Sequence, residues 1–130
     1  MTSTSPSLRI VVDVETAFPE TPVGEAARAM ARRQVGCLPV VDRSSRVIGI
    51  VTDRDLTRRV LALGLDPIRT RVDEVMSHPV ITGCLEDHPS EVEATMRREG
   101  VRRLPVVGRD GRLVGLVVTE APPAPPERTS

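Results

Sequence analysis

A threonine and an aspartate three residues apart follow directly on an apolar run that ends at Val51. The order from there is Thr52, Asp53, Arg54 and Asp55. Where a strand leads into a helix N-terminus, free N–H groups and the positive end of the helix dipole favour an anion. There the Thr52 hydroxyl could donate to a phosphate oxygen and the Asp55 carboxylate could accept both hydroxyls of a ribose, while Arg54 supplies positive charge. The stretch is therefore suited to a ribose phosphate.

The same four residues also fit a purely structural role. Threonine at the N-cap and an acid at the third helical position form a capping box, in which each side chain accepts a hydrogen bond from the other residue's backbone N–H. The two interpretations are compatible, because a side chain that caps an empty helix can still meet a ligand. Spacing alone leaves both open for Thr52 and Asp55.

The chain repeats itself at an interval of 66 residues. "LPVV" at Leu38–Val41 recurs at Leu104–Val107, and 8 of the 16 positions from Gly36 to Val51 are identical in the two copies. The chain therefore contains two copies of one unit. We expect a disordered N-terminus over 1–7, a first unit over 8–66, a second unit over 67–120, and a proline-rich disordered tail over 121–130.

The spacing of apolar residues and the positions of capping and turn residues predict the elements of the first unit. Thr21 suits an N-cap and Pro22 the first helical position, and apolar residues then recur at helical spacing. Two β-rich runs, "LPVV" and "VIGIVT", are separated by the polar turn "DRSSR" and predict an antiparallel hairpin. The expected order is a strand near Glu15–Phe18, a helix from Pro22 to Gln34, the hairpin, and a helix ending at Gly64 that carries Leu56, Val60, Leu61 and Leu63.

The second unit differs at its end. A helix is expected from Pro89 to Glu99, followed by a second hairpin of "LPVV" and "LVGLVV". Where the closing helix should begin, the chain reads "TEAPPAPPERTS", and four prolines within five residues are incompatible with a helix. The second unit is therefore expected to lack its closing helix. We expect Leu8–Val14 or a second protomer to cover the sheet face that this loss exposes.

Composition excludes several classes of function. Eighteen basic and eighteen acidic residues balance, and Phe18 is the only aromatic residue, so nucleic acid is not an expected partner. No apolar run approaches the roughly 20 residues that span a bilayer, and the N-terminus lacks the features of a secretory signal, which predicts a cytoplasmic protein without membrane contact. No nucleophile has a convincing histidine and acid partner, and no glycine-rich phosphate loop is present. We therefore do not expect an enzyme.

Two cysteines and two histidines raise the alternative of a zinc or redox site. They are Cys37, Cys84, His78 and His88, and they show neither Cys-x-x-Cys nor paired-histidine spacing. We expect the cysteines in the core and the histidines in exposed turns, with no metal bound. Arg103, at the start of a strand in the second unit, either lines a solvated edge or meets the phosphates of a ligand.

Taken together, "TPVGEAARAMARRQVGC" and "LPVVDRSSRVIGIVTDRDL" resemble a CBS domain, named for cystathionine β-synthase. The repeat makes the chain similar to a tandem CBS pair, or Bateman module, over about residues 8 to 120. The connector "GLDPIRTRVDEVM" resembles those of stand-alone two-CBS proteins of the hypoxic-response and stress type. The resemblance implies an α/β (α+β) fold of two β-α-β-β-α units related by a pseudo-twofold axis, and commonly a homodimer. It also implies clefts between the units that hold AMP, ADP, ATP or S-adenosylmethionine.

The resemblance also implies roles for residues of this chain. Thr52 would meet the phosphate and Asp55 the ribose. In the second unit Val118 stands in place of Thr52 and Ala121 in place of Asp55, so we expect at most one standard ribose site. The residues that would line the adenine end are Thr16, Ala17, Cys37, Leu38, Pro39 and Ile50.

The expected function is that of a stand-alone regulatory module. It would bind an adenosine nucleotide in the cleft served by Thr52 and Asp55 and signal through its dimer geometry or by docking on a partner protein. Two alternatives stay open: a ligand-free homodimeric interaction protein, favoured by the incomplete second unit, and a redox or zinc sensor that uses Cys37 or Cys84. Both a parallel and an antiparallel dimer are compatible with the sequence.

Overall fold

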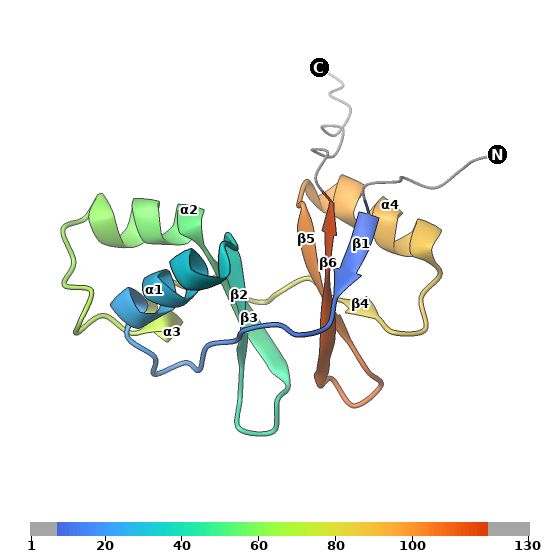
Figure 1. Cartoon of the computed structure of the whole chain (residues 1–130), viewed down its shortest axis with the longest axis horizontal. Helices are drawn as coiled ribbons and strands as arrows, with labels where there is room; N and C mark the ends of the chain where they lie inside the picture. Colours follow the sequence, from blue (N-terminus) through green and yellow to red (C-terminus); the bar gives the residue numbers. More distant parts are fainter. Residues whose placement is uncertain (1–7, 120–130) are drawn as a thin grey trace, which may run out of the picture.

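Two units of mixed α and β structure make up the computed structural model, which describes residues 8–119 (Figure 1). The first unit has a two-stranded sheet, and the second a four-stranded sheet in the order β1-β6-β5-β4. The predictions for residues 1–7 and 121–130 lie outside the described residues. The elements are β1 (Leu8–Val11), α1 (Val23–Arg33), β2 (Cys37–Val41), β3 (Val47–Thr52), α2 (Asp53–Leu56), η1 (Thr57–Leu61), α3 (Val72–Val75), β4 (Gly83–Cys84), α4 (Pro89–Glu99), β5 (Arg103–Val107) and β6 (Leu113–Thr119).

Helix α1 covers nearly the range expected from the sequence. It begins after Pro22, the extended N-cap residue, and ends before Gln34, which adopts the left-handed conformation (φ 56°). Thr21 is not the N-cap, because its hydroxyl accepts a hydrogen bond from the Phe18 N–H (3.0 Å) and closes the turn before the helix. The apolar side of α1 packs against β2 and β3.

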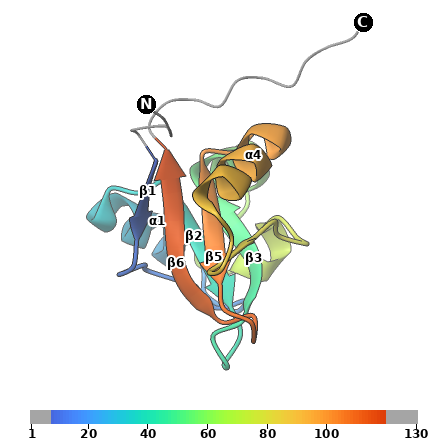
Figure 2. The same cartoon turned by 90° about the vertical axis from the view of Figure 1, so that its right-hand side faces the viewer.

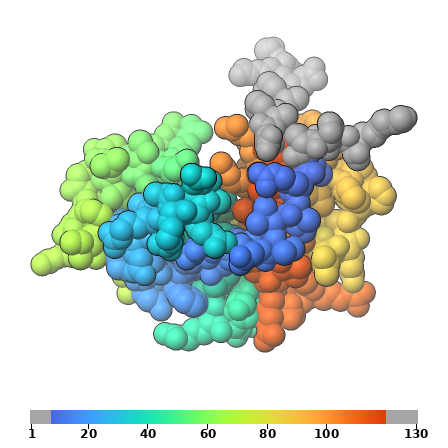
Figure 3. Space-filling model, in the orientation of Figure 1, coloured from blue at the N-terminus to red at the C-terminus, as the bar shows by residue number. Residues whose placement is uncertain are grey.

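The expected strand near Glu15–Phe18 is reduced to a single bridge. Only Ala17 pairs, in parallel with Val40; its N–H donates to the Pro39 carbonyl (3.0 Å), and its carbonyl accepts from the Val41 N–H (2.9 Å). The chain before this residue crosses from β1 in the second unit's sheet to α1 in the first unit (Figure 3). It therefore runs beside β2 for only one residue.

The helix that closes the first unit changes its winding after one turn. The N–H of Ala62, the residue after η1, donates to the Thr57 carbonyl five residues earlier (2.9 Å). The helix therefore ends before the predicted limit at Gly64. This wider winding rotates the later side chains away from the positions that a 3.6-residue period predicts. Val60 and Leu61 lie in η1 as expected and Leu63 lies beyond its end; Val60 is buried, whereas Leu61 and Leu63 are 76% and 67% exposed.

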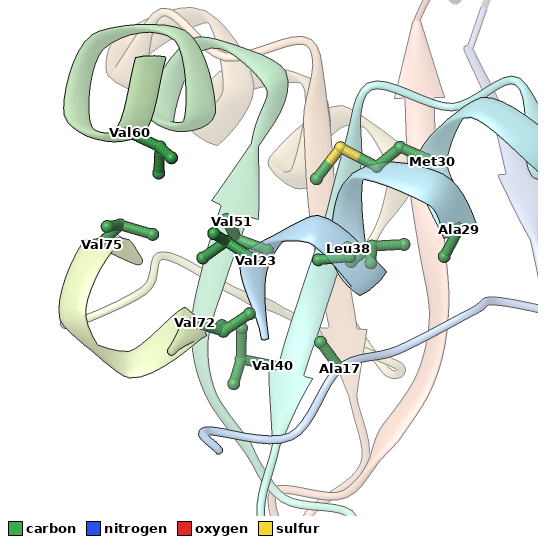
Figure 4. Close-up of a cluster of buried hydrophobic side chains, with 11 residues drawn as sticks. Ala17, Val23, Ala29, Met30, Leu38, Val40, Val51, Val60, Val72 and Val75 are labelled. Carbon is green, nitrogen blue, oxygen red and sulfur yellow. The ribbon is translucent and has the colours of Figure 1, made fainter. Parts of the chain in front are cut away.

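The core of the first unit lies between its hairpin and the helices α1, η1 and α3 (Figure 4). Leu56 and Met76 pack against it from the side. Each buried aliphatic side chain of this kind contributes about 1.5–3 kcal/mol. The buried members are Ala17, Val23, Ala26, Ala29, Met30, Leu38, Val40, Val51, Val60, Val72 and Val75.

The second unit has one described helix on its sheet. Helix α4 spans the expected residues and lies over β5, while β6 and β1 lie beside it with no described helix in front of them (Figure 2). Strand β1 pairs antiparallel with β6, with Leu8 opposite Thr119. The prediction that Leu8–Val14 covers the exposed face is corrected, because this strand extends the sheet in its plane and Leu8 alone packs on the core. That core is small: Val92, Met96, Leu104, Val106 and Val117.

The turns of the two hairpins are hydrogen-bonded to each other. The Val47 N–H donates to the Gly111 carbonyl (3.2 Å), and the Leu113 N–H donates to the Ser45 carbonyl (2.9 Å). The Arg46 side chain adds a bond from Nε to the Asp110 carbonyl (3.0 Å). These bonds hold the units together at one end of the hairpins, so any cleft between them lies at the other end.

No helix in residues 8–119 combines the length and the apolar character needed to cross a bilayer.

Candidate functional site

The corner between β3 and α2 is a complete capping box. The Thr52 N–H donates to Asp55 Oδ2 (3.0 Å), and the Asp55 N–H donates to Thr52 Oγ1 (3.0 Å). The structural interpretation of the Thr-x-x-Asp spacing is therefore confirmed. Arg54, between them, is exposed and has no ion pair within the described part of the chain.

The Asp55 carboxylate is buried, with only 8% of the residue exposed. Its Oδ1 accepts a long hydrogen bond from Ser77 Oγ (3.5 Å) and lies 4.0 Å from Arg59 Nη1. Ser77 is held there because its backbone pairs with Ile50 of β3 in both directions (2.9 and 3.2 Å). A ribose reaches this oxygen only if Ser77 gives way. The four-residue spacing to Arg59 could have indicated one of these contacts, whereas no local pattern indicates Ser77.

A cleft of about 530 Å³ lies between the units, at the ends of the hairpins opposite their joined turns. The chain around the end of α1 forms one wall, and the start of β5 with the end of β6 forms the other. Under the 66-residue repeat, Val118 in this cleft corresponds to Thr52. The cleft is therefore the second unit's counterpart of the capped corner, and Thr52 and Asp55 do not line it.

Arg103 reaches across this cleft to the first unit. A Cβ at Gly36 would lie 2.7 Å from Arg103 Nη2 and 3.1 Å from Asp53 Oδ2, so any larger residue there would make the guanidinium group shift. The guanidinium group thereby comes close to the residue that follows Thr52. Within residues 8–119, neither Arg102 nor Arg103 forms an ion pair or a side-chain hydrogen bond. Two guanidinium groups are therefore open to an anion.

The acidic side chains of the opposite wall already have partners. Arg33 Nη2 donates to the Asp13 carbonyl (2.7 Å) and lies 3.5 Å from the Asp13 carboxylate, and Arg33 Nε lies 3.9 Å from Glu15. These contacts offset the charges at the end of α1. Sequence reasoning missed this wall, because Arg33 meets Asp13 and Glu15 from a distant part of the chain and no local pattern indicates these contacts. The charge available to a ligand is therefore that of Arg102 and Arg103.

The six residues expected at the adenine end do not gather around one cavity. Only Cys37 lines the cleft. The Leu38 side chain packs in the core of the first unit, and the backbones of Ala17 and Pro39 are already bonded to each other. Thr16 and Ile50 are half-buried and do not line the cleft.

The two cysteines have opposite environments. Cys37 is buried, and burial raises the pKa of its thiol to about 11; Arg103 lowers this pKa and Asp53 raises it by smaller amounts. Cys84 is exposed, contrary to the expectation that both lie in the core, because β4 ends there and its N–H donates to Asp87 Oδ2 in a surface turn (2.9 Å). Within residues 8–119, no group of three or more His, Cys, Asp or Glu is arranged to hold a metal ion.

A thiol reagent at pH 8 is expected to modify one cysteine in the folded chain and two after denaturation. The thiolate is the reactive form, and a thiol with a pKa of about 11 is protonated at this pH. Because the folded pKa exceeds the ordinary 9.0, the stability linked to this thiol is fully present below pH 9 and is lost as the pH rises through 11. Rapid labelling of a folded Cys84→Ser variant would contradict this expectation.

A family model for the CBS domain matches residues 9–62 and 72–120. An uncharacterized protein of Methanopyrus kandleri is 34% identical over 108 residues, which are 83% of this chain and 55% of that protein, so this chain spans little more than half of its relative. The crystal structure of Hypoxic Response Protein I with two coordinated zinc ions matches at 32% identity with a TM-score of 0.74, covering 82% of this chain and 85% of that one. CBSX2 of Arabidopsis thaliana in complex with AMP matches at 23% identity with a TM-score of 0.69, over 83% and 82% of the two chains, a likeness of fold alone.

Proposed function

The chain belongs to the CBS domain family as a CBS pair, and from this premise we propose that it is a regulatory module that binds an adenosine nucleotide between its two units. The ligands we propose are AMP, ADP, ATP or S-adenosylmethionine. That CBSX2, which shares the fold, was crystallised with AMP supports the class of ligand. We also propose that the chain acts as a homodimer and that the ligand alters its dimer geometry or its docking on a partner protein. No catalytic step is part of the proposal.

The unpaired guanidinium groups beside the cleft are the observation that carries this proposal. Arginine binds phosphate through charge-assisted, often bidentate hydrogen bonds. Arg103 can serve both the cleft and the Thr52 corner, since its guanidinium group approaches Gly36 and Asp53. The cleft volume of about 530 Å³ also falls within the range of roughly 300–1,000 Å³ that is usual for small-molecule sites. A nucleotide phosphate is the group that best matches this charge and size.

Asp55 has a role in the proposed switch. Binding a ribose would exchange its long hydrogen bond from Ser77 for hydroxyls of the ligand. Ser77 lies between α3 and β4, in the segment that joins the two units. A ligand that prefers the arrangement with Ser77 displaced shifts the population toward it. The other proposed contacts are Thr52, Arg54 and Arg103 for the phosphates, and, at the adenine end, Cys37, the one of the six expected residues that lines the cleft.

The open cleft favours a second position for the same ligand. It has room for a nucleoside and shares Arg103 with the capped corner. The sequence has Ala121 at the counterpart of Asp55, so a nucleotide placed there would be held without a carboxylate at the usual ribose position. The two positions predict different responses to mutation.

Titration calorimetry with AMP, ADP, ATP and S-adenosylmethionine tests the proposal on chain purified without nucleotide. We expect micromolar affinity at about one site per chain. Arg103→Ala should weaken ATP binding at least tenfold, because a charge-assisted hydrogen bond contributes about 1.5–3 kcal/mol. S-adenosylmethionine carries no phosphate and should be affected much less.

Two further variants locate the nucleoside. Asp55→Asn keeps an oxygen for the capping hydrogen bond but loses the carboxylate, and Val35→Trp places a bulky side chain at an exposed position in the wall of the open cleft. Loss of binding in Asp55→Asn alone places the ribose at the capped corner, and loss in Val35→Trp alone places it in the open cleft. Failure of all four compounds to bind the wild-type chain would overturn the proposal and favour the ligand-free interaction protein.

A further inference from the structure

Asp53 is the first residue of α2, and its carboxylate is exposed. Its backbone is held in place on both sides, because the N–H donates to the Gly36 carbonyl (2.9 Å) and the carbonyl accepts from Thr57 Oγ1 (3.0 Å). Within residues 8–119, however, the Asp53 side chain forms no ion pair and no hydrogen bond. Its negative charge therefore has no direct partner in this part of the chain.

The Asp53 carboxylate faces the guanidinium group of Arg103 across the position of Gly36. A Cβ at this glycine would lie 3.1 Å from Asp53 Oδ2 and 2.7 Å from Arg103 Nη2, so the two groups approach the same point from different units. The Cys37 thiol, whose pKa burial raises to about 11, responds to both charges, since Arg103 lowers this pKa and Asp53 raises it. Asp53 and Arg103 are therefore close enough to attract each other through space without a direct ion pair.

Asp53 differs from the other acids near the open cleft. Gly36 and Arg103 line the cleft, and Asp53 lies against Gly36 without lining the cleft itself. The two acids that do line it, Asp13 and Glu15, lie 3.5 and 3.9 Å from a guanidinium group of α1, which offsets their charges. A phosphate that approaches Arg103 in the cleft therefore also approaches the charge of Asp53, which no ion pair within residues 8–119 offsets.

We propose that Asp53 sets the charge preference of the nucleotide site by competing with ligand phosphate for Arg103. The carboxylate draws the guanidinium group toward the first unit, and a phosphate has to draw it back into the cleft. Ligands that depend on Arg103 are therefore held less tightly than they would be without Asp53, and ATP, with three phosphates, is affected more than AMP. S-adenosylmethionine has no phosphate and is not affected. This inference rests on the proposed function and adds the residue that ranks its ligands.

A purely structural role for the Asp53 carboxylate makes a different prediction. An acid in the first turn of a helix interacts favourably with the helix dipole, which affects stability but does not rank ligands. Glu25 has the same role in α1, because it is exposed, lies in the first turn and forms no ion pair within residues 8–119. Helix α1 meets the cleft at its other end, where Gln34 lines it. Glu25 therefore provides a control that matches Asp53 in charge and helix position but not in distance from Arg103.

Titration calorimetry of the full chain compares the wild type with Asp53→Asn and Glu25→Gln. Removing a unit charge about 6 Å from the competing groups changes affinity roughly three- to tenfold in a partly hydrated site, so Asp53→Asn should bind ATP more tightly by this factor. We expect a smaller gain for AMP and less than a twofold change for S-adenosylmethionine. Glu25→Gln should match the wild type with all three compounds. Both residues are exposed, so the melting temperatures should stay close to that of the wild type.

A double-mutant cycle tests whether Asp53 acts through Arg103. In the Arg103→Ala background the carboxylate has no guanidinium group to hold, so the gain in ATP affinity from Asp53→Asn should fall below twofold. The gain in the wild-type background should also shrink when salt is raised from about 0.05 M to about 0.5 M, because salt screens exposed charges. A change in helix stability would respond to neither treatment in this way.

Three results would overturn the inference. They are an unchanged ATP affinity in Asp53→Asn, an equal gain in Glu25→Gln, and a gain that persists in the Arg103→Ala background. The proposed function fails by a separate result, namely that no adenosine compound binds the wild type. Inorganic triphosphate then decides the inference in the same set of variants, because the competition between Asp53 and a phosphate for Arg103 needs no nucleoside.

Discussion

Asp55→Ala is expected to lower the free energy of unfolding by about 1–3 kcal/mol, although the residue lies in a helix of only one turn before η1. The substitution leaves the N-cap bond in place, because the Thr52 hydroxyl still accepts from the backbone N–H of residue 55. It does leave the partly buried Thr52 N–H without its acceptor, Asp55 Oδ2, and an unsatisfied buried donor costs about 1–3 kcal/mol. Urea unfolding followed by far-ultraviolet circular dichroism measures the change.

Two further variants provide the controls for this prediction. Asp53→Ala removes an exposed carboxylate from the same turn, and a surface change of this kind stays within about 0.5 kcal/mol. Asp55→Asn retains a side-chain oxygen for the Thr52 N–H and should recover most of the stability lost in Asp55→Ala. Equal stability of Asp55→Ala and Asp53→Ala would show that the capping box contributes nothing measurable.

This comparison also bears on function. If Asp55→Asn is stable and still loses nucleotide binding, the carboxylate acts on the ligand in addition to capping α2. If stability and binding fall together in every variant, the residue supports the corner and the ligand contacts lie elsewhere. Asp55 can both cap α2 and bind a ligand only if Ser77 moves away from Oδ1, because the carboxylate is buried.

The features that the sequence predicts correctly are those set by local pattern or by the repeat. Helix α4 follows from Pro89 and the spacing of Val92 and Met96, and both hairpins follow from short apolar runs around polar turns. The capping box follows from the spacing of Thr52 and Asp55 alone. Such features depend on residues within a few positions of one another, so their physical causes are visible in one stretch of sequence.

The features that were missed depend on contacts between distant segments. Ser77 reaches Asp55 because the connector pairs with β3, and Arg103 reaches Gly36 because the two hairpins are joined at their turns. The winding of η1 turned Leu61 outward, against a periodicity that assumed an α-helix. The residues expected at the adenine end were taken from a resemblance, which cannot say whether a backbone group is already bonded within the chain.

The unequal cores of the two units lead to the second large effect, a difference between Leu38→Ala and Leu104→Ala. The two leucines occupy equivalent positions in the repeat, and each is 1% exposed. Leu38 is enclosed by α1, η1 and α3, so the cavity left by its truncation cannot collapse, and we expect a loss of about 3–5 kcal/mol in the free energy of unfolding. Leu104 belongs to the small core beside an apolar groove between α4 and the strands β1 and β6, where Val92 and Val117 have room to move, and we expect about 2–3 kcal/mol.

Urea unfolding at a protein concentration low enough to keep the chain monomeric measures both values, because dimerisation adds to the apparent stability. Equal losses would mean that the groove gives Leu104's neighbours no freedom to relax.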